Sequence, residues 1–138
     1  MTKSAYPVSI KGALVRDGRV LLVRNERDEW ELPGGRIEDN ETPEHTVTRE
    51  ISEEAGLPVT VAEILDSWMY HITVADKDVF IVTYGCTTDS TAGAVVSHEH
   101  NRIAEFVEHK IAALPMPEGY KRSIGTWFDQ LRVLHATG

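Results

Sequence analysis

Three glutamates, Glu50, Glu53 and Glu54, lie within five consecutive residues and are the strongest candidates for chemistry in this sequence. If the segment is helical, spacings of three and four place them within an arc of about 100°. The apolar residues Val47 and Ile51 lie directly beside that arc, so we expect the acids at the edge of the core. Carboxylates held together there repel one another, and a bound cation stabilises them. The pattern therefore predicts a divalent-metal site.

The residues around these acids are typical of a helix with defined ends. Thr42 is a favoured N-cap residue, Pro43 suits the first helical position, and Gly56 suits a left-handed C-terminal cap. We therefore predict a helix from Thr42 to Ala55. Acidic runs on helices commonly form only a solvated face, and the helix alone leaves this alternative open.

The turns on both sides of the helix add fixed positions to the pattern. From residue 35 to residue 57 the chain reads GRIEDNETPEHTVTREISEEAGL. This spacing resembles the Nudix box of the Nudix hydrolases at every fixed position, and nine specified positions make the match specific. The matching residues are Gly35, Glu41, Arg49, Glu50, Ile51, Glu53, Glu54, Gly56 and Leu57.

The resemblance implies a role for individual residues. Glu50, Glu53 and Glu54, together with the carbonyl of Gly34, are expected to bind Mg²⁺, with Mn²⁺ as a substitute. Magnesium prefers oxygen ligands and keeps open positions for water and phosphates. Arg49 is expected to hold a box glutamate in place, and the loss of such support costs about 10-fold to 100-fold in activity.

The general base has two candidates. In some Nudix enzymes it is the first glutamate of the box helix, which is Glu50 here, and in others it is a glutamate from a later loop. The loop Ser97 to Arg102 offers Glu99, which we take as the preferred candidate for metal binding or water activation. Glu105 and Glu108 are weaker alternatives.

The resemblance implies that water attacks a nucleoside diphosphate linked to another moiety, so the predicted function is that of a metal-dependent pyrophosphohydrolase. A nucleoside triphosphate, ADP-ribose and a nucleotide sugar all stay open as substrates. A non-catalytic Nudix module that senses a nucleotide or binds a protein is the alternative, although such relatives often lose box acids and none is missing here. Candidate phosphate contacts are Arg24, Arg27 and Arg36. Aromatic candidates for stacking a base include Trp30, Trp68, Tyr70 and Tyr84.

The composition fits one soluble domain over residues 1–138, with 41% hydrophobic and 26% charged residues. A formal net charge of -8 disfavours binding to long nucleic acid. The single cysteine, Cys86, excludes an intrachain disulfide. The sequence contains neither a signal peptide nor a membrane-spanning run, so we expect a cytoplasmic protein without a membrane partner. Homodimers are common in the family, and this sequence leaves that state open.

Strand patterns lie on both sides of the box. Val8 to Val15 and Arg19 to Asn25 are predicted to form a hairpin through Asp17-Gly18. Trp30 to Leu32 is a short extended piece before Pro33, and the glycines that follow let the chain turn. The other predicted strands are Val59 to Leu65, Ser67 to Val74 and Val79 to Cys86, with a short one near Ile103 to Val107.

A second helix is predicted near the C-terminus, where apolar residues recur at spacings of three and four. The strand ending at Cys86 has apolar residues on both faces, which indicates cover from two sides. These patterns fit an α/β/α sandwich with a mixed sheet, and the Nudix resemblance implies the same fold class. The apolar positions of the second helix are Tyr120, Ile124, Trp127, Phe128, Leu131 and Leu134.

Overall fold

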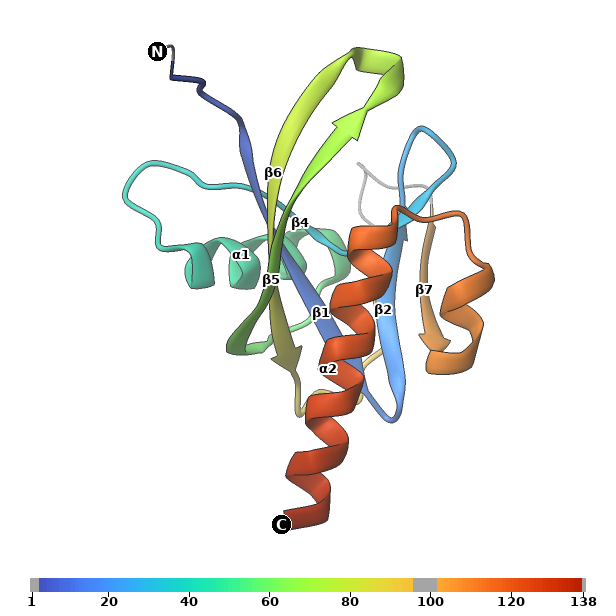
Figure 1. Cartoon of the computed structure of the whole chain (residues 1–138). Coiled ribbons are helices and arrows are strands. Elements are labelled where there is room, and N and C mark those ends of the chain that lie inside the picture. Colours follow the sequence, from blue (N-terminus) through green and yellow to red (C-terminus); the bar gives the residue numbers. More distant parts are fainter. Residues whose placement is uncertain (1–2, 96–101, 138) are drawn as a thin grey trace.

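The structure, a computed structural model, describes residues 3–95 and 102–137. They fold into a mixed β-sheet that lies between helices (Figure 1). The helices are α1 (Pro43–Ala55) and α2 (Glu118–Thr137), with short 3₁₀ helices η1 (Thr73–Ala75) and η2 (Glu108–Ala113). The strands are β1 (Val8–Arg16), β2 (Arg19–Arg24), β3 (Trp30–Glu31), β4 (Gly34–Arg36), β5 (Thr60–Ile72), β6 (Lys77–Thr87) and β7 (Arg102–Val107).

Strand β1 is the centre of the sheet. It pairs in parallel with β6, from Val8 opposite Phe80 to Leu14 opposite Cys86. It also pairs antiparallel with β2 and β4, while β2 pairs with β3 and β7 and β5 pairs with β6, all antiparallel. The prediction of a mixed sheet is therefore confirmed.

The first hairpin forms where the sequence predicts it. Arg16 lies opposite Arg19, and the two turn residues have positive φ angles of 51° at Asp17 and 72° at Gly18. Positive φ at both central positions matches the right-handed twist of the flanking strands.

Helix α1 has the predicted ends. The Thr42 hydroxyl accepts a hydrogen bond of 3.2 Å from the backbone N–H of His45, and Gly56 ends the helix in the left-handed conformation with φ 68°. The apolar face of the helix, Val47, Ile51 and Ala55, is fully buried. This face packs on one side of the sheet, which places the neighbouring residues of the helix beside the strands.

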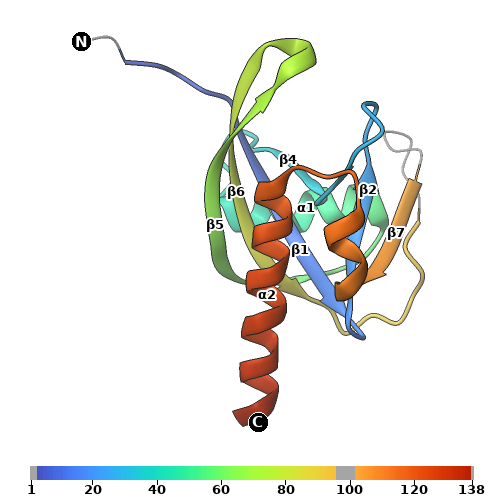
Figure 2. The same ribbon diagram turned by 45° about the vertical axis from the view of Figure 1, so that its right-hand side comes forward.

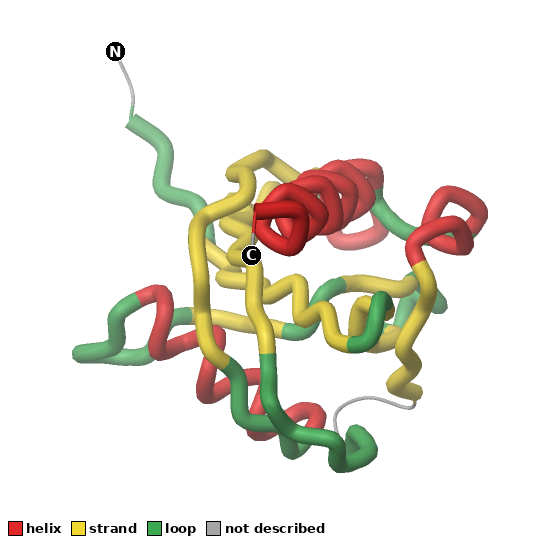
Figure 3. The backbone as a smooth tube through the Cα atoms, turned by 90° about the horizontal axis from the view of Figure 1, so that it is seen from below, coloured by secondary structure: helices red, strands yellow, loops and turns green. Residues whose placement is uncertain are grey.

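Helix α2 covers the opposite face of the sheet, as Figure 2 and the view from below in Figure 3 show. Its buried residues include Tyr120, Ile124, Trp127 and Phe128, all predicted as core positions. The expected α/β/α arrangement is therefore confirmed. Within the described residues, no helix has the length and apolar content needed to cross a membrane.

The structure corrects two predicted boundaries. The segments predicted as separate strands, Val59 to Leu65 and Ser67 to Val74, are joined in the single strand β5, which ends at Ile72 before Thr73 and Val74 enter η1. The pairing of β5 with β6 shifts register between Val61 and Asp66. A bulge accommodates an extra residue in one strand and disrupts the pairing only locally, so the strand continues.

The glycine pair is also more ordered than a turn. Gly34 and Gly35 pair with β1 as part of β4, opposite Lys11 and Ile10. A Cβ atom on Gly34 would lie 2.0 Å from the carbonyl oxygen of Ile10, so only glycine lets the two strands approach this closely. The chain instead bends at Pro33, directly before β4. The N–H of Gly12 donates to the carbonyl of Pro33 at 2.9 Å, next to the pairing of Lys11 with Gly34.

Candidate functional site

The three glutamates of α1 lie in different environments. The whole Glu54 residue is only 3% exposed, whereas the side chain of Glu50 is 14% exposed and that of Glu53 is 58% exposed. The backbone N–H of Gly34 donates a hydrogen bond of 3.3 Å to Oε2 of Glu54. The helix therefore points one acid into the protein, one along its edge and one toward solvent.

This arrangement corrects the expectation that all three carboxylates crowd together. Among the residues that the structure describes, no group of three or more His, Cys, Asp or Glu side chains is close enough to hold a metal. The three acids lie on one helix, but the glycines of β4 lie against only two of them, Glu50 and Glu54. Glu50 and Glu54 interact directly, whereas Glu53 is joined to Glu50 through Arg49.

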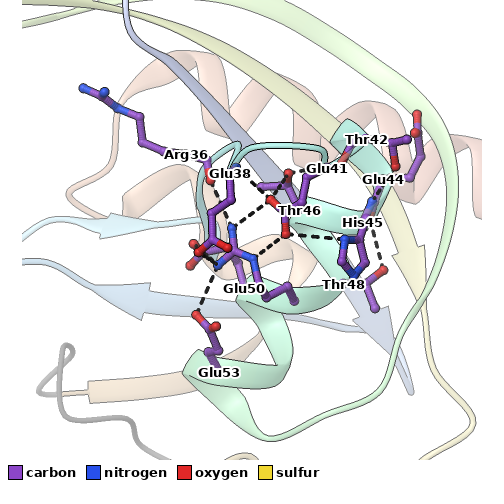
Figure 4. A network of polar contacts seen from close by, with 11 residues as sticks. Arg36, Glu38, Glu41, Thr42, Glu44, His45, Thr46, Thr48, Glu50 and Glu53 are labelled. Atoms are coloured by element: carbon purple, nitrogen blue, oxygen red, sulfur yellow. Dashed lines mark hydrogen bonds and ion pairs between the residues drawn. The ribbon is translucent and has the colours of Figure 1, made fainter.

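Arg49 donates hydrogen bonds to Glu41, Glu50 and Glu53, which Figure 4 labels in one network of polar contacts. Its guanidinium donates to both carboxylate oxygens of Glu41, at 2.5 and 3.1 Å. It also donates to Oε1 of Glu50 at 2.9 Å and to Oε2 of Glu53 at 3.3 Å. A further hydrogen bond of 3.1 Å to the carbonyl of Arg36 joins the helix to the end of β4.

Glu41 holds Arg49 in this position. Besides Arg49, it accepts hydrogen bonds from the N–H of Glu38 at 2.9 Å and the hydroxyl of Thr46 at 2.8 Å. The bonds from Arg49, followed by that from the backbone of Glu38, lower the pKa of Glu41 from 4.5 to about 2. Glu41 is therefore ionised at neutral pH, and it fixes the arginine that in turn orients Glu50.

The glycines of β4 bring backbone against the acids. A Cβ atom on Gly35 would lie 2.5 Å from Oε1 of Glu50, and Gly34 already donates to Glu54. A larger residue at position 35 would push the Glu50 carboxylate away. Glycine at both positions therefore keeps the main chain beside the carboxylate pair.

Lys11 is a functional candidate that the sequence reasoning missed. It is 7% exposed in β1, opposite Gly34, and its ammonium lies 3.7 Å from Oε1 of Glu31. Burial acts to lower the pKa of Lys11, but Tyr120 and the carboxylates of Glu31, Glu54 and Glu50 raise it above its usual value. The only local signal is a single lysine inside an apolar strand, and that signal does not identify its neighbours.

Glu50 and Glu54, the acids beside β4, have the chemistry of a cation site. Burial raises the pKa of Glu54 well above its usual value; Lys11 opposes this shift, and the adjacent Glu50 carboxyl adds to it. Such a shift marks two like charges held close in a poorly solvated place, which a cation relieves. Magnesium often takes one or two carboxylates with waters and substrate phosphates. The donor set therefore fits a hard divalent cation without a third acid beside the pair.

The candidate loop base, Glu99, lies outside the described residues. The two weaker alternatives are engaged in ion pairs. Glu105 accepts from Arg16 at 2.6 Å, and Glu108 accepts from Arg132 at 2.6 Å. Among the described acids, Glu50 is therefore the base candidate that lies in the network of Arg49.

Two of the candidate phosphate contacts are bound to neighbouring carboxylates, and the side chain of the third points away from the Arg49 network. Arg24 lies 3.0 Å from Asp28 and 5.4 Å from the centre of the Trp30 ring. Arg27 bonds to Glu29 at 3.2 Å in the turn between β2 and β3. The side chain of Arg36 points away from the network in Figure 4, although its carbonyl is part of it.

The aromatic candidates have different roles. Trp30 is buried, with its ring 5.0 Å from that of Phe106, and the hydroxyl of Tyr84 donates to Glu44 at 2.9 Å. Trp68 packs edge-on against Tyr120, at 4.9 Å between ring centres. Tyr70 differs from these three because it lines a cavity on the α2 face of the sheet.

Comparisons with known proteins show which family the chain belongs to. The model of the NUDIX domain matches residues 6–128. The chain is 29% identical over 137 residues to a putative ADP-ribose pyrophosphatase, YjhB, of Bacillus subtilis, covering 94% of this chain and 65% of that protein. It is 46% identical over 59 residues to an 8-oxo-dGTP diphosphatase of Proteus vulgaris, covering 39% of this chain and 50% of that protein. The chain thus spans less than two thirds of the length of either relative.

A solved structure shows the same fold. The NUDIX hydrolase from Nitrosomonas europaea superposes with a TM-score of 0.79 at 17% identity, covering 91% of this chain and 90% of that one. The family match extends over most of the described residues and includes α1, β4 and the network of Arg49. This chain therefore belongs to the Nudix hydrolase family.

Proposed function

We propose that this chain hydrolyses the phosphoanhydride bond of a nucleoside diphosphate linked to another moiety, with a divalent cation. The observation that carries the proposal is the close carboxyl pair of buried Glu54 and partly buried Glu50 beside the glycine strand β4. A fixed pair of acids with backbone alongside suits a cation and a diphosphate.

The proposed cation ligands are Glu50, Glu53 and Glu54, with the Gly34 carbonyl and Glu99, and the cation is Mg²⁺ or Mn²⁺. When bound, the metal supplies charge neutralisation on the phosphoryl oxygens and an oriented water. Arg49 holds the Glu50 carboxylate at 2.9 Å in a fixed direction, so this acid does not need to reorganise during the reaction.

Glu50 and Glu99 are the proposed acceptors of the proton of the attacking water. A general base must lie within hydrogen-bond reach of the water it activates. Glu50 is held beside β4, where the substrate diphosphate is expected. Arg24, Arg27 and Arg36 remain proposed phosphate contacts, and two of them would have to leave their present carboxylate partners.

The proposed substrate is a small nucleotide. The relatives named for ADP-ribose and for 8-oxo-dGTP both act, by those names, on a nucleotide with a phosphoanhydride bond. The net charge of -8 also disfavours a long polyanion. A cation between the acids and the diphosphate removes that repulsion locally.

A phosphate-release screen across nucleoside diphosphate compounds with Mg²⁺ tests the proposal. We expect turnover of at least one compound, and we expect Glu53→Gln to lower it by about 100-fold or more, since even indirect support of a metal site is worth 10-fold to 100-fold. Glu53 is exposed, so the variant keeps its fold. Glu63→Gln, another exposed glutamate, is the matched control and should retain full turnover. Full activity of Glu53→Gln would refute the assignment, and binding without any turnover would favour a nucleotide-sensing module.

A further inference from the structure

A small cavity adjoins the proposed site on the α2 face of the sheet. Its volume is about 180 Å³, and its polar lining includes Lys11, Asn25, Arg27, Glu31, Tyr70 and Tyr120. Lys11 lies opposite Gly34 in the pairing of β1 with β4, so one lining residue of the cavity neighbours the strand of the proposed diphosphate site. Pockets for drug-sized ligands measure about 300–1,000 Å³. This cavity therefore takes one ring system of a nucleotide and not the whole molecule.

Lys11 is a buried donor that lacks a hydrogen bond in the described part of the chain. It is 7% exposed, and its one partner there is Oε1 of Glu31 at 3.7 Å, which is longer than a hydrogen bond. An ammonium has three N–H donors, and here they are available to an acceptor in the cavity that Lys11 lines. A ligand acceptor inside the cavity would satisfy this group.

The basic and acidic side chains that line the cavity balance in charge, so the cavity is not suited to a phosphate group. Lys11 and Arg27 face two carboxylates in the lining, those of Glu26 and Glu31. Arg27 is already bonded to Glu29 and Glu26, at 3.2 Å each. The remaining walls are the rings of the two tyrosines and aliphatic side chains of β5 and β6. Such a lining favours an uncharged, flat ring that both accepts and donates hydrogen bonds.

Glu31 is held in a fixed orientation for such a ring. Its Oε2 accepts from the side-chain amide of Asn25 at 3.1 Å. The amide oxygen of Asn25 in turn accepts from the backbone N–H groups of Arg27 and Glu29, at 2.9 and 3.1 Å. Asn25 therefore fixes Oε2 of Glu31 and, among the described residues, keeps one amide N–H unused. The Lys11 ammonium and Oε1 of Glu31, 3.7 Å apart, are a donor and an acceptor side by side that a ligand can contact.

We propose that this cavity binds the nucleobase of the substrate, and that Lys11 and Glu31 select a base with a carbonyl next to a ring N–H. Guanine, hypoxanthine and uracil have this edge. Lys11 donates to the carbonyl oxygen, and Glu31 accepts from the N–H. Adenine in the same orientation would place its amino group against the ammonium and its ring nitrogen against the carboxylate, which leaves both protein groups unpaired. The inference rests on the proposed function, because it names the base class of that substrate.

Calorimetric titration of the intact chain with inosine and adenosine 5′-monophosphates tests the inference. These two ligands differ at the carbonyl and its neighbouring ring nitrogen, and neither contains an anhydride bond. We expect the inosine compound to bind at least about 10-fold more tightly, the order of discrimination that paired hydrogen bonds to a base edge provide. Equal affinities, or no binding of the inosine compound, would overturn the inference.

Lys11→Met should bring the two affinities to within about threefold, whereas the matched control Lys110→Met, at an exposed lysine outside the cavity, should keep the wild-type ratio. An unchanged ratio in a folded Lys11→Met protein would also overturn the inference. If that variant does not fold, the wild-type ratio alone decides. Selective binding without phosphate release from any nucleoside diphosphate compound would refute the proposed function and support the base selectivity, while hydrolysis with equal affinities would do the reverse.

Discussion

Arg49 connects three acids of the site, because one guanidinium contacts Glu41, Glu50 and Glu53. Only arginine has a planar fork that bonds both oxygens of one carboxylate and still reaches two others. A lysine would keep the charge and lose this geometry. At the scale of single residues, orientation and not charge alone is therefore what the network supplies.

Arg49→Lys should therefore lower kcat/KM by about 10-fold to 100-fold, the usual cost of losing support for a metal or catalytic group. The measurement is Mg²⁺-dependent phosphate release, with circular dichroism to show that the fold persists. Arg19→Lys, at an exposed arginine of the first hairpin, is the matched control. Wild-type activity in Arg49→Lys would mean that the network does not orient Glu50.

Glu41 gives a pH-dependent signature of the same network. Its pKa is lowered from 4.5 to about 2 by Arg49 and the Glu38 backbone, so its ionised form stabilises the folded state above about pH 4.5. This contribution is lost as the pH falls from there toward 2. The thermal midpoint of Glu41→Gln should lie below that of the wild type at pH 7, and the difference should shrink as the pH is lowered to about 2.5. A difference that stays constant with pH would contradict this account.

At the scale of elements, β4 positions the site through its close approach to β1. Gly34 has φ 150°, and an added Cβ would meet the backbone of Ile10 at 2.0 Å. Gly34→Ala should therefore lower the free energy of unfolding by about 3 kcal/mol or more, because a backbone clash is added to strain of about 1–3 kcal/mol.

Chemical denaturation measures this effect, with Gly18→Ala as the control. Gly18 also has positive φ, at 72°, but an added Cβ there meets nothing within 4 Å. Its cost should be limited to the left-handed conformation, about 1–2 kcal/mol. Equal losses in the two variants would show that β4 does not press on β1 as the structure has it.

The elements also show what the sequence could predict. Thr42, Pro43 and Gly56 act on the chain within one helical turn, so both ends of α1 were predicted correctly. The single strand β5 was missed because its continuity depends on pairing with β6. The local sequence around Asp66 and Ser67 does not contain that pairing. Local signals therefore located the elements, and non-local pairing decided where some of them begin and end.

The candidate site shows the same difference between what local sequence signals predict and what non-local contacts decide. The box spacing placed Glu50, Glu53 and Glu54 on one helix, yet only the position of β4 decides that Glu54 is buried and Glu53 is exposed. Lys11 could not be predicted as part of the site, since its surroundings come from β3, β4 and α2. Its isolation in an apolar strand is a weak signal without those partners.

At the scale of the whole molecule, β1 carries different chemistry on its two faces. Ile10 packs under α1 with the side that holds the acids, and Lys11 faces the cavity and α2. Because successive side chains of a strand point to opposite faces, one central strand can connect a diphosphate site with a base pocket. The sandwich thus brings residues from the first, middle and last thirds of the chain to one region.

The central claim is that the carboxyl pair of α1 binds a divalent cation beside β4. The most direct measurement is anomalous X-ray diffraction from crystals grown with Mn²⁺ and a nucleoside diphosphate compound that the protein binds. The account predicts an anomalous peak bonded to carboxylate oxygens of Glu50 and Glu54. A peak only at other residues, or an empty carboxyl pair with the nucleotide bound elsewhere, would contradict it.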